Sequence, residues 1–514
     1  MYLATDGLPQ AVMLKGYGNE GHDSANSEYA DIAEREGGVE DFQELIKIAH
    51  DYNTEIGIHV NAQEAYPEAA SFNEEMLQKP FSNGWGWLDQ SQVIDKLWDL
   101  SSQARWKRFV QLYDRINGTD FYSRKWPDAV ENSLGEVNAT KEEIKKDAES
   151  REDNMDFIYL DVWYQDAWET RQIADEINSL GWRFSTEFSA EGEYDSTWQH
   201  WSTDAAYGGA TSKGYNSDII RFIRNDQRDS QVLNYPQFGG TADNPLLGGY
   251  RLYGFEGWGG DKDYDNYILQ TFNQNLPTKF LQHYYVTDWE NYEEGESPVG
   301  NHEKQITLRN DSGDEVVVTR NEEQRSDDNI ERTITLNGKK VLDDVTYLLP
   351  WTDNQDGSEK LYYWNLDGGQ TTWELPDGWE GLANVVMYEL SDQGRINETS
   401  VAVSGNSVTL DAKAATAYVL VKGDAAGVKE LANDFGEYDY VTDPGFNGYA
   451  AGEKLSADEW SGDISDDAVV VEKADTGDQR LAFNSPLDGV SVTTTIKGLT
   501  KGTELRSRSL CGKQ

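Results

Sequence analysis

Short apolar segments alternate with longer amphipathic segments between Gln10 and about Val286. The apolar segments predict β-strands at 10–17, 55–60, 156–161, 183–188, 204–209 and 279–286, with a weaker strand at 232–236. Between them, residues 39–52 and 168–180 carry apolar side chains at helical spacing, and the second of these helices ends at Gly181. Strands that alternate with helices predict a parallel sheet, and so many units favour a (β/α)8 TIM-type barrel.

The count of strands is short of a complete barrel. We count six or seven strands rather than eight, and Met1 falls where a helix should already be ending. The sequence therefore predicts a barrel that lacks its first strand and is incomplete at the N-terminus. An open barrel would expose sheet edges, so we expect poor solubility or no activity from this chain alone.

The pattern changes after about residue 300, where short alternating strands lie between turns rich in Asp, Asn and Gly. This pattern is typical of an antiparallel β-sandwich. A helix-like segment at 429–436 precedes a third, all-β segment. We therefore expect three domains. They are a catalytic barrel at 1–300, a β-sandwich at 301–424, and a linker with a truncated, carbohydrate-binding type of β-sandwich at 425–514.

Composition and charge narrow the classes of function. The formal net charge is −49 with no basic cluster, so nucleic acid and anionic membrane surfaces are poor partners. Cys511 is the single cysteine, which excludes a disulfide framework and a Cys-based zinc site. No apolar run approaches the roughly 18 residues of a membrane helix, and the first ten residues do not resemble a signal peptide.

Two carboxylates follow predicted strands in the way that sugar hydrolysis requires. Asp161 ends the strand 156–161, and Glu187 lies near the end of the next strand, 26 residues later. Equivalent ends of neighbouring strands lie about 5 Å apart, which is the separation of the nucleophile and the acid/base in retaining glycosidases. We expect Asp161 to be an ionised nucleophile and Glu187 to be a general acid with a raised pKa. The alternative is that each carboxylate has a structural role only, as a helix cap or as a member of an ion pair.

Aromatic and histidine residues add weaker candidates. The acid at 161 is flanked by Trp163, Tyr164 and Trp168, and a glycine-rich loop carries Trp85 and Trp87, which predicts an aromatic sugar pocket. Each Trp of that loop could instead be packed beneath it. Further candidates are His22 and Asp23 after the first strand, His59 and Asn61 after the second, and Asp288 and Glu290 after the last. A satisfied core histidine is the other interpretation of His59, and the histidines show no metal-ligand spacing.

Eight blocks in order resemble the endo-α-N-acetylgalactosaminidases, glycoside hydrolase family 101. They are LKGYGNEGHDS, GIHVNAQEAYPEA, NGWGWLDQ, DFIYLDVW, GWRFSTEF, EYDSTWQHW, RFIRNDQ and FEGWGG. The resemblance implies a retaining enzyme that releases the core-1 disaccharide, galactosyl-β-1,3-N-acetylgalactosamine, from serine or threonine of mucin-type glycoproteins. It implies that Asp161 is the nucleophile and Glu187 the acid/base, and that Asp23, His22, Trp85 and Trp87 contact the sugar.

The same resemblance implies a secreted or cell-wall-associated bacterial protein. We expect no required cofactor, no catalytic metal, a monomer, and room for a structural calcium ion. The loop after DVW is shorter than is usual in the family, and residues 114–154 look inserted, so a preference for core-3 or longer glycans stays open. Two rival functions are a glycan-binding protein that does not hydrolyse its ligand and a different retaining glycosidase, such as an amylase-like enzyme.

Overall fold

The computed structural model describes most of the chain between residues 1 and 495. The parts outside this description are 20, 26, 87–89, 129–133, 164–165, 188–194, 200–245, 248–253, 256–262, 294, 297–302, 322–330, 393, 424–445, 447–448, 458–459, 465–468, 474–478, 484–490 and 496–514. The predicted strands at 204–209 and 232–236 and the predicted helix at 429–436 lie outside the described residues.

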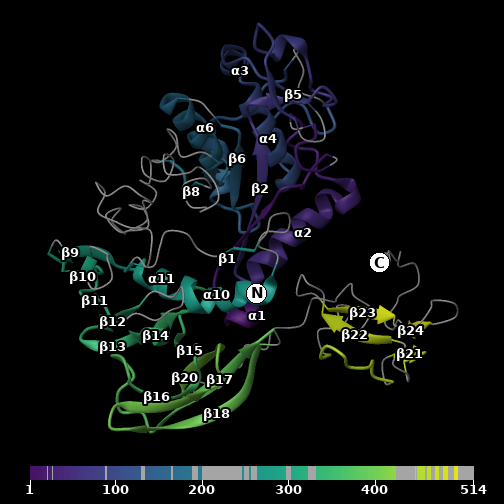
Figure 1. The fold of residues 1–514 in the computed structure, drawn as a ribbon. Helices are drawn as coiled ribbons and strands as arrows, with labels where there is room; N and C mark the ends of the chain where they lie inside the picture. The colour runs from purple at the N-terminus through teal and green to yellow at the C-terminus, as the bar shows by residue number, and fades with distance from the viewer. Residues whose placement is uncertain are drawn as a thin grey trace. The chain divides into compact units, whose positions relative to one another are not determined.

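A parallel sheet forms the first part of the chain (Figure 1). Its strands, in spatial order, are β1 Gln10–Leu14, β2 Thr54–Asn61, β6 Phe157–Asp161, β7 Arg183–Thr186 and β8 Trp198–Gln199. The first four confirm predicted strands. Within the described residues the sheet is open rather than closed into a barrel.

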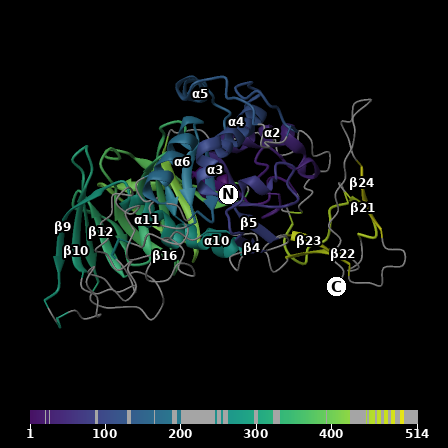
Figure 2. The ribbon, with the colours of Figure 1, turned by 90° about the horizontal axis from the view of Figure 1, so that it is seen from above.

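Helices pack on one face of this sheet. They are α2 Gly38–Asp51, α4 Ala104–Asn117, α5 Lys141–Ala148 and α6 Ala167–Ser179. Helix α4 contacts both α2 and α6, and Figure 2 shows it between them. The smaller elements of this part are α1 Tyr2–Thr5, η1 Glu34–Glu36, β3 Glu64–Ala65, η2 Glu74–Met76, β4 Asn83–Gly86, β5 Gln90–Val93 and α3 Lys96–Ser102.

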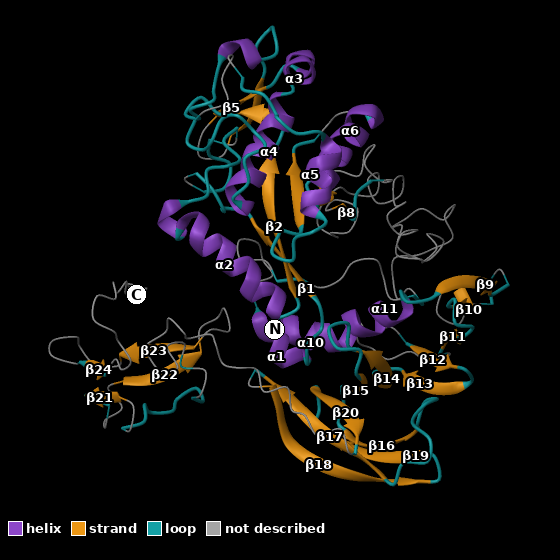
Figure 3. Cartoon of the chain, turned by 180° about the vertical axis from the view of Figure 1, so that it is seen from behind, coloured by secondary structure: helices purple, strands orange, loops and turns teal. Residues whose placement is uncertain are grey.

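The alternation of side chains along each strand separates the core from the site. Ile56, Ile58 and Val60 of β2 are buried in the same core as the apolar residues of the helices. Figure 3 shows helices α4, α5 and α6 beside the parallel strands. Because successive side chains of a strand point to opposite faces, His59 and Asn61 lie on the other face. Polar groups therefore gather on the face of the sheet away from the helices.

An antiparallel sheet of twelve strands follows, in agreement with the predicted β-sandwich. Strands of this sheet bury an apolar cluster that contains Leu361, Trp373 and Leu410. In chain order the strands are β9 Tyr285–Asn291, β10 Glu303–Arg309, β11 Glu315–Arg320, β12 Arg332–Leu336, β13 Lys339–Asp343, β14 Thr346–Thr352, β15 Glu359–Asn365, β16 Gly369–Glu374, β17 Asn384–Ser391, β18 Gly394–Ser404, β19 Ser407–Ala412 and β20 Thr416–Lys422.

The last predicted barrel strand, 279–286, is wrong. The structure has a π-helical turn, η4 Thr271–Asn275, followed by helix α11 Leu276–Leu281, and strand β9 begins only at Tyr285. Pro277 stands in the first turn of α11, where a missing backbone N–H costs nothing, and Leu276 and Phe280 are buried one turn apart. Strand β9 pairs antiparallel with β10, so the antiparallel sheet begins before residue 300.

Residues 253–271 and 425–514 form a separate compact unit. Its described elements are α10 Tyr264–Gln270, β21 Trp460–Gly462, β22 Val469–Lys473, β23 Gln479–Phe483 and β24 Val492–Thr494. Strand β21 pairs with β24 and β22 with β23, each antiparallel. Across the described part of the chain, no helix has both the length and the apolar character needed to cross a membrane.

Candidate active site

The parallel register brings Asp161 and Glu187 to the same edge of the sheet. Asn61 on β2 lies opposite Asp161 on β6, and Leu160 lies opposite Thr186 on β7. The backbone N–H of Glu187 donates to the carbonyl of Leu160 at 3.0 Å, which continues this register by one residue. The two carboxylates are therefore neighbours at the carboxyl ends of adjacent strands, where barrel enzymes carry their functional groups.

The two side chains touch. A hydrogen bond joins the carboxyl groups of Asp161 and Glu187, and the backbone N–H of Val162 donates to Glu187 Oε2 at 3.0 Å. The residue directly after Asp161 thus holds the carboxyl group of Glu187 beside that of Asp161.

The pKa of Asp161 differs from the expectation. Burial raises this pKa from 3.8 to about 7, the charges of Asp23 and Glu64 add to the rise, and the hydrogen bond from Glu187 and the charge of Lys15 oppose it. We expected an ionised Asp161, and burial explains the difference, because the Asp161 side chain is only 15% exposed. The raised pKa expected for Glu187 stays a prediction.

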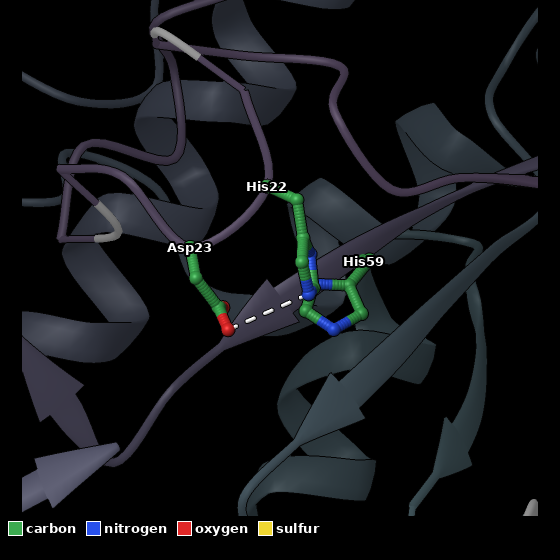
Figure 4. Close-up of side chains that lie close together, drawn as sticks. All are labelled: His22, Asp23 and His59. Atoms are coloured by element: carbon green, nitrogen blue, oxygen red, sulfur yellow. Dashed lines mark ion pairs between the residues drawn. The ribbon is translucent and has the colours of Figure 1, made fainter. Parts of the chain in front are cut away.

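His22, Asp23 and His59 lie close together (Figure 4). His59 Nε2 lies 3.5 Å from Asp161 Oδ2, and His22 Nε2 lies 3.4 Å from Asp23 Oδ2. The rings of the two histidines meet edge to face with centroids 4.5 Å apart. Burial lowers the pKa of each histidine to about 4, so both are neutral near pH 7. They act as hydrogen-bonding groups rather than as charges, and His59 faces the site instead of being a residue of the apolar core alone.

These three side chains also bring possible metal donors together, within 4.8 Å of one another. Two imidazoles and one carboxylate suit zinc-like ions, whereas calcium binds through oxygen ligands alone. The cluster does not test whether the protein has room for a structural calcium ion. Imidazole and carboxyl groups are also of the kind that binds sugar hydroxyls.

The aromatic candidates separate into exposed and buried groups. Trp85 on β4 is 54% exposed, and Trp87 lies outside the described residues, as does Tyr164. Trp163 is buried, its indole N–H donates to Thr170 Oγ1, and the Arg105 guanidinium lies 5.2 Å from its ring centre. Trp163 is therefore a packing residue and not a sugar platform. Trp168, on α6, is 64% exposed.

Three further residues near the site were missed from the sequence. Lys15 follows β1 at the same edge of the sheet, and Glu64 and Tyr66 follow the end of β2. The sequence placed Lys15 inside the predicted strand 10–17, whereas the observed strand β1 ends just before it. Conversely, Asp288 and Glu290 lie on β9 in the antiparallel sheet, where Glu290 pairs with Lys304.

Comparison with known proteins agrees with the geometry. Residues 1–128 and 125–268 match the family described as "Endo-alpha-N-acetylgalactosaminidase", residues 274–396 match "Glycosyl hydrolase 101 beta sandwich domain", and residues 441–506 match "Endo-alpha-N-acetylgalactosaminidase, domain 5". A Renibacterium salmoninarum protein named "Putative endo-alpha-N-acetylgalactosaminidase" is 31% identical over 456 residues, which are 87% of this chain and 26% of that protein. This chain therefore spans about a quarter of the length of that relative.

Among solved structures, the α-N-acetylgalactosaminidase NagBb from Bifidobacterium bifidum is 13% identical over 62% of this chain and 49% of its own, with a TM-score of 0.38. The maltogenic α-amylase AmyB from Thermotoga neapolitana is 10% identical over 80% of this chain and 90% of its own, with a TM-score of 0.32. The sequence matches carry the assignment, and they show that this chain belongs to the endo-α-N-acetylgalactosaminidase family of glycoside hydrolases.

Proposed function

We propose that this protein is a retaining endo-α-N-acetylgalactosaminidase. The observation that carries the proposal is the hydrogen-bonded carboxyl pair of Asp161 and Glu187 at adjacent strand ends. Membership of the family supports the class of substrate, which is an O-glycan linked through α-N-acetylgalactosamine.

Each carboxyl group has one role in each step of the proposed reaction. In the first step Asp161 attacks the anomeric carbon, while Glu187 gives its proton to the glycosidic oxygen of the leaving serine or threonine. In the second step Glu187 takes a proton from water, which attacks the anomeric carbon and displaces Asp161. The proposal requires a free enzyme in which Glu187 holds this proton and Asp161 is ionised.

The close contact of the carboxyl groups favours retention over inversion. Inverting enzymes keep their two carboxyl groups about 6.5–9.5 Å apart, so that a water molecule fits between the sugar and the base. Carboxyl groups that share a hydrogen bond are closer together than this. The hydrogen bond between Asp161 and Glu187 has to break when the sugar binds between them. The N–H of Val162 keeps Glu187 in place when that happens.

The proposed substrate is the core-1 disaccharide on mucin-type glycoproteins. His22 and Asp23 would hydrogen-bond sugar hydroxyls, and the exposed face of Trp85 would stack on the apolar face of a ring. Such substrates lie outside bacterial cells, so we also propose that the protein works extracellularly or on the cell wall, as a monomer.

The test uses an aryl α-glycoside of the disaccharide and native mucin glycopeptides. Asp161→Ala should abolish release of the disaccharide from both, whereas Asp153→Ala, which changes a half-exposed surface carboxylate, should not. Hydrolysis by Asp161→Ala at the wild-type rate would refute the mechanism. Glycan binding without hydrolysis by the wild-type protein would instead favour the glycan-binding alternative.

A further inference from the structure

Glu64 is a buried carboxylate that the proposed reaction does not use. It lies on β3 and is 4% exposed. Three donors converge on it. Trp85 N–H lies 3.2 Å and 3.1 Å from its two oxygens, Ser91 Oγ donates to Oε2 at 2.6 Å, and Asn61 Nδ2 donates to Oε2 at 3.1 Å. A carboxyl group can accept hydrogen bonds from all three of these groups.

The donors come from two different parts of the site. Asn61 ends β2 directly opposite Asp161 in the parallel register. Trp85 and Ser91 belong to the β4–β5 hairpin, which carries the exposed indole. Strand β5 also pairs with β3, so Glu64 lies where the hairpin meets the end of the parallel strand. Its carboxylate therefore connects the position of the Trp85 backbone to the strand end beside the nucleophile candidate.

The packing around Gly84 shows how closely the hairpin approaches this carboxylate. A Cβ atom added at Gly84 would lie 2.3 Å from the carboxyl carbon of Glu64 and 2.4 Å from Ser91 Oγ. Only glycine allows the hairpin to reach the carboxylate at this distance. This close approach explains why glycine stands at position 84.

We propose that Glu64 is a positioning residue that fixes the Trp85 hairpin over the sugar site by binding its backbone. The inference rests on the proposed function, because a sugar has to occupy the site for Trp85 to contact it. Glu64 itself would touch neither the sugar nor the reacting atoms. Its loss would impair substrate binding more than the chemical step.

The charge of Glu64 should also affect the pH dependence of kcat/KM. It is one of the charges that raise the pKa of Asp161. Replacing Glu64 by glutamine removes this charge, so the acid limb of the kcat/KM profile should move to lower pH. A side chain that only supports the hairpin would not shift that limb.

Three variants separate these effects. Glu64→Gln should raise KM about ten-fold by the loss of charge-assisted hydrogen bonds, with kcat changed less than about three-fold, and should shift the acid limb. Glu64→Asp keeps the charge but shortens the reach, so it should raise KM and leave the acid limb closer to that of the wild type. Glu75→Gln makes the same change of charge on an exposed residue of η2. It should change neither KM nor the acid limb.

Hydrogen–deuterium exchange of the segment 83–93 tests the inference without activity. Exchange should be faster in Glu64→Gln and Glu64→Asp than in the wild type or Glu75→Gln, with the rest of the parallel-sheet part unchanged. A wild-type protein that does not hydrolyse O-glycans would refute the proposed function and leave this exchange result standing. Unchanged exchange together with an unchanged KM, or a fall in kcat alone, would overturn the role of Glu64.

Discussion

The backbone N–H of Val162 donates a hydrogen bond to the Glu187 carboxylate at 3.0 Å. The residue that follows Asp161 thereby holds the other carboxyl group of the pair. Val162 does this with φ of +50°, a left-handed conformation that is a clear outlier for a β-branched residue. Strain of this kind persists where the surrounding structure enforces it, and it is common at active sites.

The strain at Val162 predicts an inverted order of stability. Both Val162→Ala and Val162→Gly remove a buried side chain, but only alanine keeps the steric cost of a left-handed backbone, about 1–2 kcal/mol. We expect Val162→Gly to be more stable than Val162→Ala by about 1 kcal/mol, measured from urea unfolding midpoints. At Val60, on regular strand β2, the order should be the usual one, with alanine the more stable. The same order at both sites would contradict the strain.

Neutralising Asp161 should stabilise the free protein at alkaline pH. The folded-state pKa lies above the unfolded value, so the folded protein binds this proton more tightly and loses stability as pH rises from 3.8 to about 7. The full change corresponds to at most roughly 4 kcal/mol. Asp161→Asn should therefore melt at a higher temperature than the wild type at pH 8, and the difference should shrink towards pH 5. If Asp161→Asn melts at a lower temperature than the wild type at pH 8, ionisation of Asp161 does not destabilise the folded protein.

Trp85 should contribute to binding of the sugar through its exposed ring. Trp85→Ala should raise KM for the aryl disaccharide about ten-fold, in line with about 1 kcal/mol or more from an aromatic contact, while Trp85→Phe should recover part of the loss. Tyr285→Ala removes an exposed aromatic ring from strand β9 of the antiparallel sheet and serves as the control. Equal effects of the two alanine variants would remove Trp85 from the sugar site.

A buried ion cluster connects the start of the chain to the antiparallel sheet. Lys360 Nζ lies 3.0 Å from Asp6 Oδ2 and 3.2 Å from Asp353 Oδ2, and Arg395 Nε lies 2.7 Å from Asp6 Oδ1. Lys360→Met leaves buried carboxylates without this cation and should cost about 3–5 kcal/mol in the free energy of unfolding. Lys340→Met breaks an exposed ion pair with Asp343 and should cost less than about 1 kcal/mol. Similar costs would contradict a stabilising role for the cluster.

The sequence predicts the sheet better than it predicts the site. Strands β2, β6 and β7 follow from apolar runs, and the nearness of Asp161 and Glu187 follows from one strand–helix–strand spacing. The raised pKa of Asp161 could not be predicted, because it depends on burial and on Asp23 and Glu64, which come from other segments. Glu64 was missed for the same reason, since two of the groups that contact it, Trp85 and Ser91, are distant in sequence. Helix α11 was read as a strand because a short apolar run suits either structure.

The anomeric configuration of the first product tests the central claim most directly. Proton NMR during hydrolysis of an aryl α-glycoside of the disaccharide distinguishes the two anomers before they equilibrate. Double displacement through Asp161, with Glu187 as acid and then base, predicts that the α-anomer appears first. A β-anomer formed first would mean that water attacks the sugar directly, which would contradict the assignment of Asp161 as the nucleophile.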